Sequence, residues 1–247
     1  MKKVVLILIG LLTILAICRL FIIKRAPFVG VPFVPNGITV DKGKFPITGI
    51  DVSAHTGKIN FSEISKQKID FVFLKATEGK NFVDPSFERN YINVSSHSLK
   101  VGFYHFFRFN KDGTAQAENF LRRIKGKKTT LPLVIDVEEW GNGNLLNKST
   151  DNVIREIRAF ITTVEKKSGK KVMVYSNESS YKKYIRGRFD KNDLWICSFS
   201  KSPKVGKKWT LWQHSHKGTL VGANGWIDIN TFNGNRKEWS NYLRKQS

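Results

Sequence analysis

Short apolar runs recur along the chain from residue 47 onward, and each has the length of a strand buried in a sheet. These runs occupy residues 47–52, 71–76, 101–107, 131–137, 171–175, 194–198, 211–214 and 226–230. The segments between the earlier runs carry apolar residues at helical spacing, which predicts helices over residues 61–68, 87–96, 114–124 and 150–167. Alternating strands and helices are typical of a parallel sheet, open or closed into a barrel. The later runs lie too close together for helices, so we expect the C-terminal third to be mostly strand.

The segment 150–167 is the clearest helix prediction. Its apolar residues fall on one stripe, formed by Val153, Ile157, Phe160, Ile161 and Val164. Ser149 or Thr150 is placed to cap the N-terminus of this helix, and Gly169 is placed to end it.

The first 25 residues are of a different kind. Residues 4–23 are predominantly apolar with one charge, Arg19, and about twenty such residues are enough for a helix to cross a bilayer. A cleavable signal has a shorter apolar region and small residues at the cleavage site, so we prefer an uncleaved anchor to a cleaved signal. Residues 26–46 contain four prolines and no helical period, which predicts an extended linker. The chain is therefore divided into an anchor or signal (1–25), a linker (26–46) and a catalytic barrel domain (47–247).

The charge of the chain is strongly positive, with 42 Lys and Arg against 20 Asp and Glu and a net charge of +22. Residues 1–25 hold five of the basic groups and no acidic one, which leaves 37 basic and 20 acidic groups, a net +17, on residues 26–247. Such a surface favours polyanions such as nucleic acid, anionic lipid or anionic cell-wall polymer. No nucleic-acid-binding motif is present, so no specific nucleic-acid partner is expected.

The cysteines and histidines do not predict a metal site. Cys18 and Cys197 lie in unrelated contexts, and the five histidines are scattered without metal-ligand spacing. We expect neither a metal nor a cofactor.

Two carboxylates close the run that begins at Leu131. Asp136 and Glu138 are two residues apart, so in a strand their side chains point to the same face, about 6.5–7 Å apart along the chain, while Val137 points into packing. A carboxyl pair of this kind serves acid-assisted cleavage of glycosidic bonds. The alternative is a strand end with two solvated acids.

Further acids occupy corresponding positions on other runs. Catalytic groups of a β/α barrel lie at the C-terminal ends of several strands. Asp51 closes the first run and Asp228 lies in the last one, while Glu78 follows the second. If the runs form a barrel, acids from distant parts of the sequence converge on one cleft.

Eight short segments carry a family resemblance. They are Gly49-Ile-Asp-Val-Ser53 with Gly57, Phe73-Leu-Lys-Ala-Thr-Glu-Gly79, Gly102-Phe-Tyr-His-Phe106, Leu133-Val-Ile-Asp-Val-Glu138, Val174-Tyr-Ser176, Leu194-Trp-Ile196, Leu211-Trp-Gln213 and Ile227-Asp-Ile-Asn230. In this order they resemble glycoside hydrolase family 25, the Chalaropsis-type lysozymes. The resemblance implies an irregular β/α barrel with a strand-rich C-terminal third. It also implies hydrolysis of the β-1,4 bond between N-acetylmuramic acid and N-acetylglucosamine in peptidoglycan.

The resemblance also implies roles for individual residues. Glu138 corresponds to the general acid and Asp136 to its partner carboxylate, while Asp51 and Asp228 correspond to flanking acids of the cleft. The residues that correspond to the lining of the substrate groove are Tyr104, Tyr175, Trp212 and Gln213. The chain departs from the family at Ile59-Asn60-Phe61 and at Cys197-Ser198-Phe199, which affects the rim of the groove and leaves the acids in place.

The expected protein is an exported lysozyme of the bacterial envelope. Residues 4–23 would contact the lipid bilayer with the catalytic domain outside the cytoplasm, and cleavage of the segment would make the protein secreted. Its expected partners are peptidoglycan glycan strands and anionic envelope polymers. Two alternatives remain: an endoglycosidase for another N-acetylhexosamine polymer such as chitin, and a non-catalytic glycan-binding module on the same fold.

Overall fold

The computed structural model describes residues 37–139, 144, 149–206 and 208–246. Within these residues, eight strands close into a barrel in the order β1-β9-β8-β7-β6-β5-β4-β2, and β2 pairs with β1 to complete the ring. The strands are β1 (Thr48–Val52), β2 (Phe71–Glu78), β4 (Lys100–Phe106), β5 (Leu133–Asp136), β6 (Val172–Asn177), β7 (Leu194–Cys197), β8 (Leu211–Gly218) and β9 (Ile227–Phe232). A two-residue strand, β3 (Phe82–Val83), forms a hairpin with β2. The alternating pattern left an open sheet and a closed barrel as alternatives, and the β/α barrel that the family resemblance implied is confirmed.

Seven of the barrel strands are parallel, and only β9 runs against both of its neighbours, β8 and β1. The close spacing of the last runs explains this irregularity, because no helix separates β8 from β9 and the chain must turn back at once. Every strand predicted from an apolar run is present, with ends that differ by a few residues.

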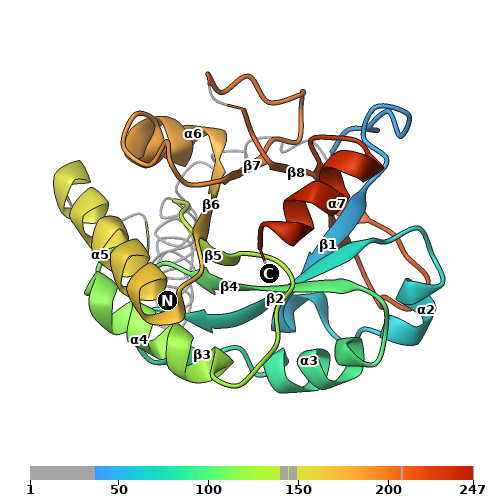
Figure 1. Cartoon of the computed structure of the whole chain (residues 1–247), viewed down its shortest axis with the longest axis horizontal. Coiled ribbons are helices and arrows are strands. Elements are labelled where there is room, and N and C mark those ends of the chain that lie inside the picture. Colours follow the sequence, from blue (N-terminus) through green and yellow to red (C-terminus); the bar gives the residue numbers. More distant parts are fainter. Residues whose placement is uncertain (1–36, 140–143, 145–148, 207, 247) are drawn as a thin grey trace, which may run out of the picture. The chain divides into compact units, whose positions relative to one another are not determined.

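Helices surround the strands (Figure 1). They are η1 (Ala54–Thr56), α2 (Phe61–Ser65), α3 (Phe87–Ser95), α4 (Gly113–Ile124), α5 (Thr150–Ser168), α6 (Glu178–Ser180), the π-helical turn η2 (Tyr181–Ile185) and α7 (Arg236–Arg244). Helix α5 begins and ends as predicted: the Ser149 side chain accepts a hydrogen bond from the Asn152 N–H, and Gly169 takes the left-handed conformation with φ 69°.

Two hydrophobic cores follow from the alternation of side chains along the strands. The larger lies between the strands and the helices and includes Ile50, Val137 and Trp212. The smaller lies inside the barrel and includes Phe73 and Trp195, whose ring centroids are 4.7 Å apart. Residues one position apart on a strand therefore belong to different cores.

Helix α7 closes the N-terminal end of the barrel. Trp239 is buried inside, with its ring 5.3 Å from that of Phe71 at the start of β2 and 5.0 Å from that of Phe232 at the end of β9. The opposite end, where the parallel strands finish, is left for the polar groups described below.

The N-terminal segments lie largely outside the described residues. The segment 4–23, expected to be a membrane anchor, and residues 26–36 of the expected linker are among those that the structure does not describe. From Gly37 on, the expected linker contacts the barrel: Val40 and Phe45 are buried, and Ile38 N–H donates to the His214 carbonyl. Across residues 37–139, 144, 149–206 and 208–246, no helix combines the length and apolarity needed to cross a membrane. The division into anchor, linker and catalytic domain stays a prediction.

Candidate active site

The carboxyl pair lies at the C-terminal end of β5. Asp136 is the last residue of the strand and is 6% exposed, Val137 is buried in the outer core, and Glu138 is partly exposed. The strand-like course continues past β5, because Val137 N–H donates to the Tyr175 carbonyl over 2.9 Å. The alternation predicted from the sequence thus holds through Glu138, and both carboxyl groups lie on the inner face of the barrel.

The other two predicted acids face each other across β1 and β9. Asp51 and Asp228 are partners in the antiparallel register of these strands. Asp51 accepts hydrogen bonds from Gln213 Nε2 at 2.9 Å and Asn230 Nδ2 at 2.8 Å, and it shares a hydrogen bond with the Asp228 carboxyl group. Because β9 is antiparallel, its beginning lies beside the end of β1, which brings Asp228 to the end of the barrel that holds Asp136 and Glu138.

Burial changes the protonation of all four acids. It raises the pKa of Asp228 to about 9, and the negative charges of Asp51 and Glu138 act in the same direction. Burial also raises the pKa of Asp51 to about 6, although hydrogen bonds from Asn230 and Gln213 oppose it. Near neutrality Asp228 is therefore protonated and Asp51 is ionised, which is the arrangement that lets one carboxyl donate to the other.

The pair on β5 is coupled in a similar way. Burial raises the pKa of Glu138 to about 7 against a hydrogen bond from Asn177 Nδ2, which lies 3.3 Å from its Oε2. Burial and the neighbouring charge of Glu138 raise the pKa of Asp136 above its usual value. Ionising both groups would leave two negative charges side by side in a buried site, so the pair holds one proton near neutrality.

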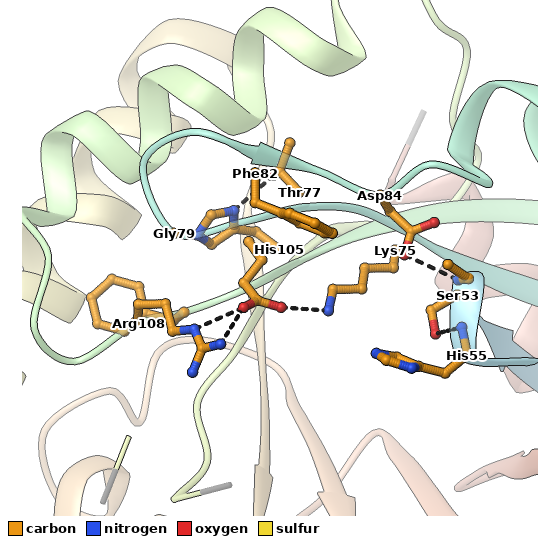
Figure 2. Close-up of polar contacts among 12 residues, drawn as sticks. Ser53, His55, Lys75, Thr77, Gly79, Phe82, Asp84, His105 and Arg108 are labelled. Carbon is orange, nitrogen blue, oxygen red and sulfur yellow. Dashed lines mark hydrogen bonds and ion pairs between the residues drawn. The ribbon is translucent and has the colours of Figure 1, made fainter. Parts of the chain in front are cut away.

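A cationic cluster lies next to the acids. Lys75, near the end of β2, is 7% exposed and donates from Nζ to Glu78 over 2.7 Å, and Arg108 Nε donates to the same carboxylate over 2.8 Å (Figure 2). Burial raises the pKa of Glu78, but Lys75 and Arg108 together bring it below its usual value. The Lys75 ammonium also lies 5.0 Å from the ring of Phe106, and its charge opposes the rise in the pKa of Asp136 and Glu138 that burial causes.

Three of the four predicted groove residues lie with the acids. Tyr175 donates to Gln213 Oε1 over 2.9 Å, and Gln213 in turn donates to Asp51. Tyr104 packs against the inner core, and burial together with the charges of Asp51 and Asp136 raises its pKa. Trp212 lies elsewhere: it is 2% exposed, packs in the outer core with its ring 5.7 Å from that of Trp209, and donates to the Ser198 carbonyl. Gln213 faces the barrel interior, so its neighbour Trp212 must face outward.

Some residues of the site were missed in the sequence. Asn230 lies two positions after Asp228, and Asn177 lies two positions after Tyr175, so strand alternation alone would have indicated both. Trp226 lies two positions before Asp228 and is 62% exposed, with Lys217 Nζ 4.4 Å from its ring centroid. An exposed aromatic ring directly before β9, two residues from Asp228, is suited to stacking on a sugar.

His105 lies apart from the four acids. It is fully buried between Thr77 Oγ1, 2.8 Å from its Nδ1, and Gln116 Oε1, 3.2 Å from its Nε2. Burial lowers the pKa of His105 to about 3, so it stays neutral.

Known proteins share both the sequence pattern and the fold. Residues 50–223 match the sequence model described as Glycosyl hydrolases family 25. The chain is 33% identical over 200 residues to Lysozyme M1 of Streptomyces globisporus, which covers 76% of this chain and 68% of that protein.

Two solved structures resemble the barrel. A family 25 glycosyl hydrolase from Bacillus anthracis superposes with a TM-score of 0.78 at 38% identity, covering 86% of this chain and 99% of that one. A bacterial lysozyme from Streptomyces coelicolor gives a TM-score of 0.75 at 31% identity, with 81% and 98% of the two chains covered.

Proposed function

The chain belongs to glycosyl hydrolase family 25, and we propose that it hydrolyses the β-1,4 bond between N-acetylmuramic acid and N-acetylglucosamine in peptidoglycan, with Glu138 as the general acid. It is a glycoside hydrolase, and its relatives in Streptomyces are named lysozymes. The observation that carries the proposal is the pair of Asp136 and Glu138 at the C-terminal end of β5, where burial raises the pKa of both carboxyl groups.

Exposure distinguishes the two members of this pair. Glu138 is partly exposed and half-protonated near pH 7, so it is able to reach a glycosidic oxygen in the cleft and donate a proton to it. Asp136 is nearly buried, and its Oδ1 has no hydrogen-bond partner among the described residues. We propose that Asp136 acts as the partner carboxylate and stabilises the positive charge that develops on the sugar.

Asp51 and Asp228 form a second carboxyl pair near Asp136 and Glu138. Asp51 is ionised but held by Gln213 and Asn230, and Asp228 is protonated, so the two together carry one negative charge rather than two. We propose that they flank the substrate and help to keep the proton on Glu138. We also propose that Tyr104, Tyr175 and Gln213 line the substrate groove. Trp212 is left out of the proposed groove because its ring lies in the outer core.

The location of the reaction follows from the proposed substrate. We propose that the catalytic domain acts outside the cytoplasm, at the bacterial envelope, and that residues 4–23 hold it at the lipid bilayer. The support for the anchor is the length and apolarity of this segment in the sequence.

The test of the proposed acid is Glu138→Gln. The amide keeps the size of the side chain and its hydrogen bond with Asn177 but has no proton to donate, so hydrolysis should fall by about 10²–10⁴-fold. The matched control is Glu139→Gln, which changes the neighbouring carboxylate that pairs with Lys183 on the surface. Turnover of peptidoglycan by purified protein, with circular dichroism to verify folding, is the measurement. Equal turnover in the two variants would remove Glu138 from the role.

A further inference from the structure

A cavity lies on the outside of the barrel. It has a volume of about 410 Å³, which is within the range of small-molecule sites. Its walls come from the segment before β1, the residues between α2 and β2, the β8–β9 connection and the beginning of α7. Thr48 of β1 and Ile229 of β9 form part of its floor.

This cavity and the acid cluster lie on opposite faces of the same two strands. Ile229 pairs with Ile50 in the register of β1 and β9, and both belong to the outer core or pack against it. The next pair in the register is Asp51 and Asp228, whose side chains face the barrel interior. A ligand in the outer cavity is therefore separated from the catalytic cleft by the wall of the barrel.

The walls of the cavity carry more positive than negative charge. Lys42, Lys68 and Arg236 line it. The carboxylate beside them is Asp70, which pairs with Arg236 at 3.0 Å. Across the described residues no ion pair involves Lys42 or Lys68, so three cations and one carboxylate leave a net charge of about +2 on the cavity walls.

Lys42 shows how an anion would be held. Its Nζ donates to Thr48 Oγ1 over 2.8 Å, which leaves further N–H donors free for a ligand. Burial lowers the pKa of Lys42, although the charge of Asp70 opposes this effect. An anion in the cavity would stabilise the ammonium group through charge-assisted hydrogen bonds.

The remaining surface favours a ligand with a carbon skeleton over a bare ion. Ile69, Leu220 and Ile229 present apolar side chains to the cavity beside the cationic groups. The wider charge of the protein, a net +17 on residues 26–247, attracts long polyanions and concentrates them at its surface. The cavity thus combines cationic and apolar walls, which suits an anionic group carried on a carbon skeleton.

We propose that the outer cavity binds the phosphate or carboxylate groups of an anionic cell-wall polymer and holds the enzyme on the wall while the cleft at the end of the barrel acts on the glycan. The assignment of the polymer to the cell wall rests on the proposed function. Binding of the polymer in the outer cavity is independent of the proposed function.

The experiment measures binding to labelled oligomers by fluorescence anisotropy, using the full-length chain in a non-ionic detergent. The probes are a glycerol-phosphate oligomer and a glucuronate oligosaccharide, with inorganic phosphate as competitor and a single-stranded oligonucleotide of equal charge for comparison. The test variant is Lys42→Gln/Lys68→Gln. The control is Lys166→Gln/Lys182→Gln, which removes the same charge from two exposed lysines on α5 and η2.

The test variant should bind one of the two wall-type oligomers about five- to tenfold more weakly than the wild type, because it loses two charge contacts. The control should change by less than about twofold, and both variants should cleave a short uncharged oligosaccharide normally. Equal weakening in the two variants would show diffuse attraction and overturn the site. Inorganic phosphate competing as well as the oligomer, or the oligonucleotide binding as tightly through Lys42 and Lys68, would overturn the polymer assignment. Binding without peptidoglycan cleavage would leave the site standing and remove the proposed function.

Discussion

At the scale of single residues, the site is a set of carboxyl groups that the barrel prevents from ionising together. Asp51 and Asp228 share one proton across β1 and β9, and Asp136 and Glu138 share another at the end of β5. Burial is the main cause in every case. Such groups weaken the fold as pH rises, because the unfolded chain ionises them at lower pH than the folded one does. This cost is expected of residues selected for chemistry.

Removing the charge of Asp136 tests the coupling in the β5 pair. In Asp136→Asn the pKa of Glu138 should fall, because a neighbouring negative charge no longer favours its protonated form. The alkaline limb of the pH–rate profile, which reports loss of the acid's proton near the Glu138 pKa of about 7, should move to lower pH while the maximal rate also falls. The profile of Glu139→Gln should stay at the wild-type position. A limb that stays in place or moves upward in Asp136→Asn would show that the two groups are not coupled.

Residue-level prediction succeeded where alternation was applied and failed where it was not. The rule that places Asp136 and Glu138 on one face also separates Trp212 from Gln213, and it would have found Asn177 and Asn230. Lys75 and Glu78 are three residues apart, which strict alternation would place on opposite faces, but the register of β2 shifts between Lys75 and Thr77 and the two side chains pair. The hydrogen bond of Arg108 with Glu78 depends on how the segment after β4 lies beside β2.

At the scale of elements, the barrel strands were predictable because each is a compact apolar run. Helix α7 was not predicted, because most of its residues are polar and only Trp239, Tyr242 and Leu243 are apolar. Its one clear local signal is the capping box formed by Asn235 and Glu238. The helix is fixed mainly by the insertion of Trp239 into the barrel.

Trp239→Ala should therefore destabilise the whole domain. Loss of a buried Trp side chain typically lowers the free energy of unfolding by about 3–5 kcal/mol. In a domain of this size, such a loss lowers Tm clearly. Activity per folded molecule should be near the wild-type value at low temperature, because Trp239 lies at the end of the barrel opposite the acids. Ile92→Ala, at a 66% exposed position on α3, is the control and should barely change Tm. Equal Tm values for the two variants would contradict the proposal that α7 stabilises the barrel by closing its N-terminal end.

At the scale of the whole molecule, the pattern of runs predicted a barrel or an open sheet without deciding between them. Closure depends on pairings between distant parts of the chain, such as the hydrogen bond between Asn230 and Asp51, which are 179 residues apart. Local periodicity carries no information about such contacts. The reversal of β9 is also a property of the whole fold, although the short spacing before it indicated that no helix would intervene.

The anchor hypothesis concerns the molecule in its cell. The intact chain should fractionate with membranes, and deletion of residues 1–25 should release a soluble protein that still hydrolyses peptidoglycan, because the acids belong to the barrel. Immunoblotting of membrane and soluble fractions, with N-terminal sequencing, is the measurement. A mature N-terminus near residue 26 in the soluble fraction would identify a cleaved signal and remove the anchor.

The most direct measurement of the proposed activity is mass spectrometry of the fragments released from purified peptidoglycan. Borohydride reduction before analysis marks the sugar at the newly formed reducing end. A muramidase must leave N-acetylmuramic acid at that position, so the released fragments should carry reduced muramic acid, and they should be absent with Glu138→Gln. Fragments that end in reduced N-acetylglucosamine, or release of no fragments by the folded wild-type chain, would contradict the assignment.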